Sequence, residues 1–122
     1  MVNDVSPDEI EDVASKTKVL LVDCWAPWCG PCLALAPIME ELEKKYSDND
    51  DVEFLKVNTQ NYRQFGIDND IRAIPCVLIY SHGQLAQVEV QDPRTGKETE
   101  TDRLIGLRPP EHYEQVIEKL LK

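Results

Sequence analysis

A pair of cysteines in the pentapeptide Trp28-Cys29-Gly30-Pro31-Cys32 constrains this chain more than any other feature of its sequence. The pentapeptide follows a nearly continuous apolar run, 19–25, and precedes a segment, 31–46, in which apolar residues recur at helical spacing. A run such as 19–25 is typical of a strand buried on both faces. The sequence therefore predicts a dithiol where a buried strand passes into a helix, an arrangement suited to redox or metal chemistry.

Length and charge limit the classes of function. The chain has 122 residues, of which 42% are hydrophobic, so we expect one domain with one core over 1–122. The 13 basic and 23 acidic residues give a formal net charge of −10, which disfavours nucleic acid or an anionic membrane as a partner. No apolar run approaches the roughly eighteen residues of a membrane span, and 1–11 lacks the pattern of a targeting segment. We expect a soluble, cytoplasmic protein.

The other segments alternate between strand and helix patterns. The expected helices are 7–15, 31–46, a short one within 59–65, and a last one that Pro109 and Pro110 open. The expected strands are 2–5, 19–25, 52–58, 75–80, 85–91 and 97–105. Strands that alternate with helices in this way predict an α/β fold, with helices packed on a mixed sheet.

The residues around the cysteine pair closely resemble those of one family, the thioredoxins. Trp-Cys-Gly-Pro-Cys is that family's active-site signature, and the resemblance runs from about Ser6 to Tyr80 and resumes at Ile105-Gly106. Further residues in the family's positions are Asp23, Trp25-Ala26, Pro37, Lys56 and Ile74-Pro75. The resemblance implies the thioredoxin fold, a three-layer αβα sandwich with a central mixed β-sheet, and the activity of a thiol-disulfide oxidoreductase.

The two cysteines receive different roles. Cys29 lies just before a helix N-terminus, where the helix dipole and free amide groups favour a thiolate, so we expect it to be the exposed nucleophile. Cys32 lies one helical turn further and deeper, so we expect it to resolve the mixed disulfide and to form the Cys29–Cys32 disulfide. Gly30 allows the bend in the chain, and Pro31 fixes the first turn of the helix.

Three further residues match groups of the family that support the thiols. Asp23 matches a buried carboxylate that exchanges the Cys32 proton, with a pKa raised by desolvation. Lys56 matches the lysine that pairs with this carboxylate, and a solvated lysine on a strand is the less favoured alternative. Pro75 matches the family's cis-proline, which lies against the thiols, presents backbone to the partner and discourages metal capture.

An apolar docking surface for the partner protein is also implied by the resemblance. The residues that match it are Trp28, Ala73, Ile74, Gly106 and Leu107. Ordinary core packing is the alternative for Trp28, but its place beside the nucleophile favours the surface.

The chain departs from the family at two cysteines and in one segment. Cys24 and Cys76 stand where the family has an aromatic residue and a threonine, and we expect both to be buried as small hydrophobic residues. Cys76 could instead form a regulatory disulfide. The acidic, threonine-rich segment at about 88–104, with a turn signal at 92–96, is an insertion that we expect to form an extended β-hairpin or a loop. Such an insertion either tunes the choice of partner or is a solvated loop.

The preferred function is that of a general protein-disulfide reductase. Its expected partners are disulfide-containing proteins and a thioredoxin reductase that donates electrons; we expect a monomer without cofactor or metal. A disulfide oxidant or isomerase of the same fold is the alternative, but it usually has a more polar dipeptide between its cysteines. A metal-binding or adaptor protein is a further alternative. It is disfavoured because Cys24 follows Asp23 on a strand and so points away from it.

Overall fold

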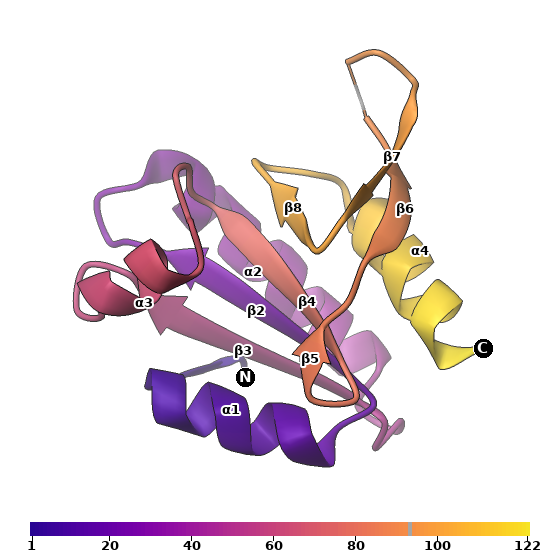
Figure 1. Cartoon of the computed structure of the whole chain (residues 1–122), viewed down its shortest axis with the longest axis horizontal. Helices are drawn as coiled ribbons and strands as arrows, with labels where there is room; N and C mark the ends of the chain where they lie inside the picture. The colour runs from indigo at the N-terminus through magenta and orange to yellow at the C-terminus, as the bar shows by residue number, and fades with distance from the viewer. Residues whose placement is uncertain (93) are drawn as a thin grey trace.

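The computed structural model describes residues 1–92 and 94–122 (Figure 1). Its helices are α1 (Pro7–Lys16), α2 (Gly30–Lys45), α3 (Arg63–Asp68) and α4 (Pro110–Leu121). Its strands are β1 (Asn3–Asp4), β2 (Val19–Trp25), β3 (Val52–Asn58), β4 (Cys76–Ser81), β5 (Gln84–Leu85), β6 (Val88–Gln91), β7 (Glu98–Thr101) and β8 (Arg103–Ile105).

The central sheet is mixed. Its strands lie in the order β1-β3-β2-β4-β5, and β8 also pairs with β4. β1, β3 and β2 run parallel to one another, whereas β4 is antiparallel to β2 and to β8. The α/β class and the mixed sheet that the sequence predicts are confirmed.

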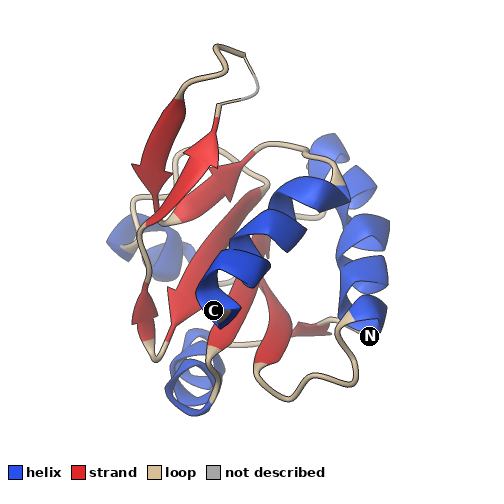
Figure 2. Ribbon diagram, turned by 90° about the vertical axis from the view of Figure 1, so that its right-hand side faces the viewer, coloured by secondary structure: helices blue, strands red, loops and turns tan. Residues whose placement is uncertain are grey.

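Helices cover both faces of this sheet. One hydrophobic cluster joins α2 and α4 to one face and includes Leu21, Leu35 and Ile117. A second cluster joins α1 to the other face and includes Ile10 and Leu20, with side chains from the region of α3 packed against it. Figure 2 shows α2 and α4 together on one side of the sheet and α3 on the other.

Strand β2 is the centre of the fold. Its residues alternate between the two clusters, with Val19 and Leu21 in one and Leu20, Val22 and Cys24 in the other. A strand with apolar neighbours on both faces needs a continuous apolar sequence rather than an alternating one. For this reason the run 19–25 predicts the strand with its observed ends.

The short helix α3 begins later than the sequence predicts. The expected position was within 59–65, whereas the helix spans Arg63–Asp68. The amide groups of Asn61 and Tyr62 donate to the carbonyl of Asn58, and the Asn58 side chain accepts from Gln60. Asn58 therefore closes a turn that delays the start of the helix.

The segment after β4 differs most from the expectation. Two continuous strands were expected, 85–91 and 97–105, and each is interrupted. β5 pairs with β4, and the chain then leaves the central sheet, so that β6 pairs with β7 and the chain returns as β8. Figure 1 shows the β6–β7 hairpin projecting beyond the central sheet, beside α4.

Packing explains why β6 leaves the sheet. Val88 is buried and Val90 is partly buried against the cluster that contains α4, while Glu89 is exposed. At the tip, the Gly96 amide donates to the Asp92 carbonyl at 2.8 Å, and Gly96 has a φ of +73° that favours glycine. The part of the predicted turn at Pro93 lies outside the described residues.

Candidate active site

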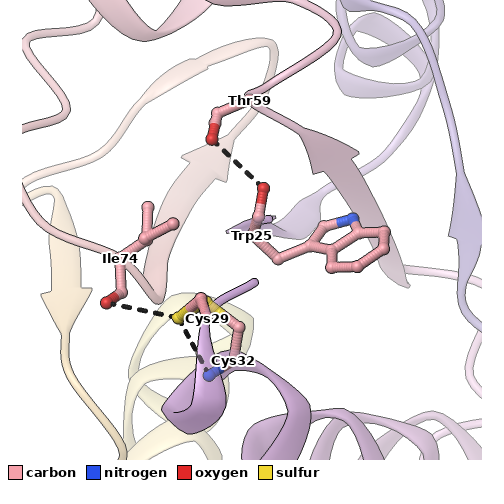
Figure 3. Close-up of a disulfide and its surroundings, with 5 residues drawn as sticks. All are labelled: Trp25, Cys29, Cys32, Thr59 and Ile74. Carbon is pink, nitrogen blue, oxygen red and sulfur yellow. Dashed lines mark hydrogen bonds between the residues drawn. A yellow bond between two sulfur atoms is a disulfide. The ribbon is translucent and has the colours of Figure 1, made fainter. Parts of the chain in front are cut away.

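The cysteine pair lies at the junction of β2 and α2. Cys29 is the N-cap residue of α2, and its Sγ atom accepts a hydrogen bond of 3.2 Å from the backbone amide of Cys32. Cys29 and Cys32 form a disulfide with a Cα–Cα distance of 5.2 Å (Figure 3). An N-terminal amide and the positive end of the helix dipole both stabilise negative charge on this sulfur when it is reduced.

Both cysteines are buried. Cys29 is 5% exposed and Cys32 is 2% exposed, so Cys32 is the deeper residue as expected, but Cys29 is not the exposed residue that the sequence analysis anticipated. The Cys29 Sγ atom lies 3.8 Å from the carbonyl oxygen of Ile74, and Ile74 packs against the cysteine pair (Figure 3). The disulfide and this neighbouring loop cover the sulfur.

Pro75 and its neighbours bring the loop before β4 onto the cysteines. The Ile74-Pro75 bond is cis, and Pro75 is buried. The Pro75 carbonyl accepts a hydrogen bond of 2.9 Å from the amide of Gly106, which follows β8. Three segments that are far apart in the sequence, at Cys29, Pro75 and Gly106, therefore meet at this point.

The residues proposed for docking lie around this meeting point. Trp28 and Leu107 have exposed fractions of 72% and 51%. Ala73 is exposed, whereas Ile74 and Gly106 are partly buried. A pocket of about 310 Å³ lies beside Trp28, and its lining is Trp28, Thr59, Arg63, Gly66, Ile67, Ile71, Arg72, Ala73 and Ile74. Gly106 and Leu107 are outside this lining; Gly106 is linked to the loop beside the cysteines by its hydrogen bond to Pro75.

Asp23 is a buried carboxylate on β2. It is 3% exposed, and its Oδ1 atom accepts no hydrogen bond from the residues that the structure describes. Loss of hydration raises the pKa of Asp23 to about 7; the charge of Lys56 lowers it and the charge of Asp4 raises it. Asp23 therefore changes its protonation state near neutral pH.

Lys56 lies next to Asp23 but does not contact it directly. The two residues are register partners in the parallel β2–β3 pair, yet no ion pair joins them within 1–92 and 94–122. The Lys56 Nζ atom instead lies 5.1 Å from the centroid of the Trp25 ring, a cation–π arrangement. Lys56 influences Asp23 through its charge at a distance, because its ammonium group is held over Trp25.

Sequence analysis missed two residues that hold Trp25. Asp4 is the register partner of Lys56 on β1, and its Oδ1 atom accepts from Trp25 Nε1 at 3.4 Å. Thr59 donates to the Trp25 carbonyl from its amide at 2.9 Å and from its hydroxyl at 3.1 Å (Figure 3). The position of Asp4 depends on the β1–β3 register, which no local sequence pattern reveals.

Cys24 and Cys76 face away from Asp23. They are register partners on β2 and β4, and both lie buried in the cluster that contains Ile10. Burial raises the pKa of both thiols, that of Cys76 to about 11, so both remain protonated and weakly reactive. That Cys76 forms a regulatory disulfide stays a prediction, which mass spectrometry after peroxide treatment tests.

Among the described residues, no group of three or more His, Cys, Asp and Glu side chains could hold a metal ion.

The fold and the site define a class of protein. A cysteine pair at a helix N-terminus, beside a loop with an X-Pro bond and after a strand that contains a buried carboxylate, is the site of a thiol-disulfide oxidoreductase. The thioredoxin family model matches residues 2–102. The chain belongs to the thioredoxin family.

Known proteins are similar to this chain in both sequence and fold. The chain is 44% identical over 84 residues to the chloroplastic M-type thioredoxin of Pisum sativum, which covers 69% of this chain and 46% of the pea protein. It is 32% identical over 111 residues to thioredoxin 1 of a Nostoc species, which covers 91% and 88% of the two chains. The solution structure of oxidised thioredoxin from Plasmodium falciparum matches with a TM-score of 0.71, 28% identity and coverage of 98% and 97%.

Proposed function

We propose that this protein is a general protein-disulfide reductase that cycles between the Cys29/Cys32 dithiol and the disulfide. The observation that carries the proposal is the hydrogen bond from the Cys32 amide to Cys29 Sγ at the start of α2. This contact stabilises a Cys29 thiolate, which is the reactive form of a thiol toward a disulfide. The Gly30-Pro31 dipeptide between the cysteines supports reduction rather than oxidation.

The cycle transfers two electrons. The Cys29 thiolate attacks one sulfur of the partner's disulfide, which forms a mixed disulfide and releases the partner's other sulfur as a thiolate. Cys32, as a thiolate, then attacks Cys29 Sγ, which releases the partner's second sulfur. The partner leaves as a dithiol and this chain holds the Cys29–Cys32 disulfide. A separate thioredoxin reductase supplies two electrons that restore the dithiol.

Asp23 serves this cycle as a proton acceptor and donor. Cys32 must lose its proton before it attacks, and a carboxylate with a pKa of about 7 accepts a proton at neutral pH. Burial of Asp23 supports this role. A carboxylate in solvent has a much lower pKa and does not hold a proton at neutral pH. Lys56 acts through its charge, since it lowers the pKa of Asp23 from the value that burial alone would give.

The partner protein docks around Cys29. Pro75 and Ile74 present backbone next to the sulfur, and the pocket beside Trp28 and Ala73 accepts apolar side chains of the partner. Gly106 and Leu107 extend the surface on the other side of Pro75.

No helix in the described part of the chain is long and apolar enough to cross a membrane. The monomeric state and the cytoplasmic location stay predictions.

Trapping tests this proposal. We expect Cys32→Ser to accumulate mixed disulfides between Cys29 and disulfide-containing proteins, because the resolving thiol is missing. The matched control is Cys76→Ser. Cys76 lies on the opposite face of the sheet, so this variant should trap nothing. Mass spectrometry of the trapped species identifies the cysteine. Trapping through any cysteine other than Cys29 would contradict the proposal.

A further inference from the structure

Arg103 is a partly buried cation that has no role in the proposed reaction cycle. It lies on β8, and its side chain is 17% exposed. Its guanidinium binds both carboxylate oxygens of Asp102, with Nε to Oδ1 at 2.7 Å and Nη2 to Oδ2 at 3.5 Å. A guanidinium that is held on one edge by such a fork points its remaining nitrogen in a fixed direction.

That remaining nitrogen holds the end of α3. Arg103 Nη1 donates to the backbone carbonyl of Asn69 at 2.6 Å and to that of Asp70 at 3.4 Å. Asp70 has a φ of +52°, a left-handed conformation that an aspartate adopts more readily than most residues with a side chain. The Asp70 amide donates to the Ile67 carbonyl and the Ile71 amide donates to the Gly66 carbonyl. The charged hydrogen bonds from Arg103 add a tertiary link to this turn.

The loop that begins at this turn carries the docking backbone. It runs from Asp70 to the cis Ile74-Pro75 bond, where the Ile74 carbonyl oxygen lies 3.8 Å from Cys29 Sγ. Gly106 binds the far end of the loop through the Pro75 carbonyl. Arg103 and Gly106 are three residues apart on one segment, so that segment holds both ends of the loop.

The loop is only partly packed against β8. A pocket of about 400 Å³ lies between the loop and β8, and its lining is Asp70, Ile71, Arg72, Ala73, Cys76, Arg103 and Ile105. This pocket is open to solvent, so the loop lacks packing contacts on that side. Ile71 and Ile74 pack against the hydrophobic clusters, and the hydrogen bonds at the two ends of the loop add to this packing.

Hydrogen bonds at the base of the inserted hairpin orient Arg103. The Thr101 hydroxyl accepts from the Arg103 amide at 3.2 Å and donates to the Arg103 carbonyl at 3.0 Å. The Asp102 carbonyl accepts from the Ile79 amide of β4 at 2.9 Å. These contacts fix the bend between β7 and β8, from which the Arg103 side chain reaches the loop.

We propose that Arg103 is a positioning residue for substrate docking: it holds the loop 69–75 so that the backbone at Ile74 meets the partner's peptide beside Cys29. The inserted segment thereby supports the active site through its base. This inference rests on the proposed reductase function, because it concerns how a protein disulfide is brought to the same cysteine pair.

The test separates docking from chemistry with two substrates. Arg103→Met removes the hydrogen bonds, Arg103→Lys keeps the charge but lacks the fork, and Arg94→Met is the matched control, since Arg94 lies in the same insertion with its side chain 89% exposed. Reduction of insulin reports docking of a protein, whereas reduction of hydroxyethyl disulfide reports the thiol chemistry alone. Hydrogen exchange at the Ile71 amide, which donates to the Gly66 carbonyl, reports loop order.

We expect Arg103→Met to raise the KM for insulin about tenfold. This factor corresponds to the stabilisation that is lost when hydrogen bonds from a charged group are removed. The rate with hydroxyethyl disulfide and the kcat for insulin should stay within about twofold, and exchange at Ile71 should accelerate. Arg103→Lys should lie between wild type and Arg103→Met, and Arg94→Met should match wild type. An unchanged KM in folded Arg103→Met, or equal losses on both substrates, would overturn the inference. Failure of the wild-type dithiol to reduce insulin would instead overturn the proposed function.

Discussion

The central strand β2 and the inserted β6–β7 hairpin are both β-structure, but different forces hold them. β2 pairs with β3 on one side and β4 on the other, and the whole of 19–24 is buried. In β6 and β7, both fully described, Val88 alone is buried, and each strand pairs with the other. The hydrophobic effect dominates the first region, whereas cross-strand pairs and contacts with α4 dominate the second.

This difference determines where chemistry can be placed. Buried strands on both sides hold Asp23 in a dry environment, which gives it a pKa near neutrality, and they fix the loop from which Cys29 emerges. The hairpin offers no such environment, because in 88–92 and 94–101 every side chain other than Val88 contacts solvent. We therefore expect substitutions in the central layer to change activity and stability strongly, and substitutions in the hairpin to change them weakly.

Removal of the nucleophile should have the largest effect. We expect Cys29→Ser to lower the rate of insulin reduction by at least about a thousandfold, because a serine hydroxyl does not attack a disulfide at neutral pH. Replacement of 91–101 by a short glycine-containing turn should leave the reduction of hydroxyethyl disulfide within about twofold. A folded hairpin deletion that lost as much activity as Cys29→Ser would break the comparison.

Asp23→Asn should have the next largest effect, and its sign depends on pH. The folded-state pKa of about 7 lies above the usual value for an aspartate, so the folded state binds the proton more tightly. The Asp23 carboxyl therefore destabilises the wild type progressively as pH rises from about 4 to about 7. We expect Asp23→Asn to raise the free energy of unfolding at pH 8 by up to about 4 kcal/mol and to leave it nearly unchanged at pH 4.

Urea unfolding at the two pH values measures this effect. Asp12→Asn is the control, because Asp12 is exposed on α1 and should change stability little at either pH. The Asp23→Asn variant should also lose the dependence of insulin reduction on a group that titrates near pH 7. Equal stabilisation at both pH values would show that Asp23 is not a buried group with a raised pKa.

Truncation of apolar side chains compares the two regions directly. Leu78 is fully buried on β4, so Leu78→Ala should cost about 3 kcal/mol in the free energy of unfolding. Val90 is partly exposed on β6, so Val90→Ala should cost less than about 1 kcal/mol. Urea unfolding of both variants measures the difference. Similar costs would show that the hairpin belongs to the same cooperative core as the central sheet.

A charge reversal in the hairpin should have the smallest effect. Glu89 and Glu100 are directly opposite in the β6–β7 pair, and like charges in this arrangement repel. We expect Glu100→Lys to raise the free energy of unfolding by about 0.5 kcal/mol at low salt and by less at high salt. Glu98→Lys is the control, since Glu98 faces the uncharged Gln91. A destabilised Glu100→Lys protein would indicate that the two carboxylates do not repel.

The parts of the fold that depend on burial could be predicted from sequence. The apolar run at β2 and the pattern at β3 predict both strands with their observed ends, because the side chains of these strands face hydrophobic clusters. The break between β5 and β6 could not be predicted, because Val88 and Val90 have the same pattern whether they pack on the sheet or beside α4. The Asn58 turn shifted α3 for a similar local reason.

The same division applies to the site. The cysteine pair, Asp23 and Pro75 lie in motifs that local sequence reveals. Asp4 and Arg103 act across strand pairs or between distant segments, so their places depend on register and on side-chain direction. Lys56 was expected to bind Asp23, but the Trp25 ring provides another position for its ammonium group, and only the folded arrangement reveals this choice.

The reduction potential of the Cys29–Cys32 couple distinguishes a disulfide reductase from a disulfide oxidant. The protein is equilibrated with mixtures of reduced and oxidised dithiothreitol, and the alkylated dithiol fraction is measured by mass spectrometry, with Cys24→Ser/Cys76→Ser as the background. A protein-disulfide reductase of this class should give a potential near about −270 mV. A potential of about −120 mV, typical of a disulfide oxidant, would show that the protein is not a reductase.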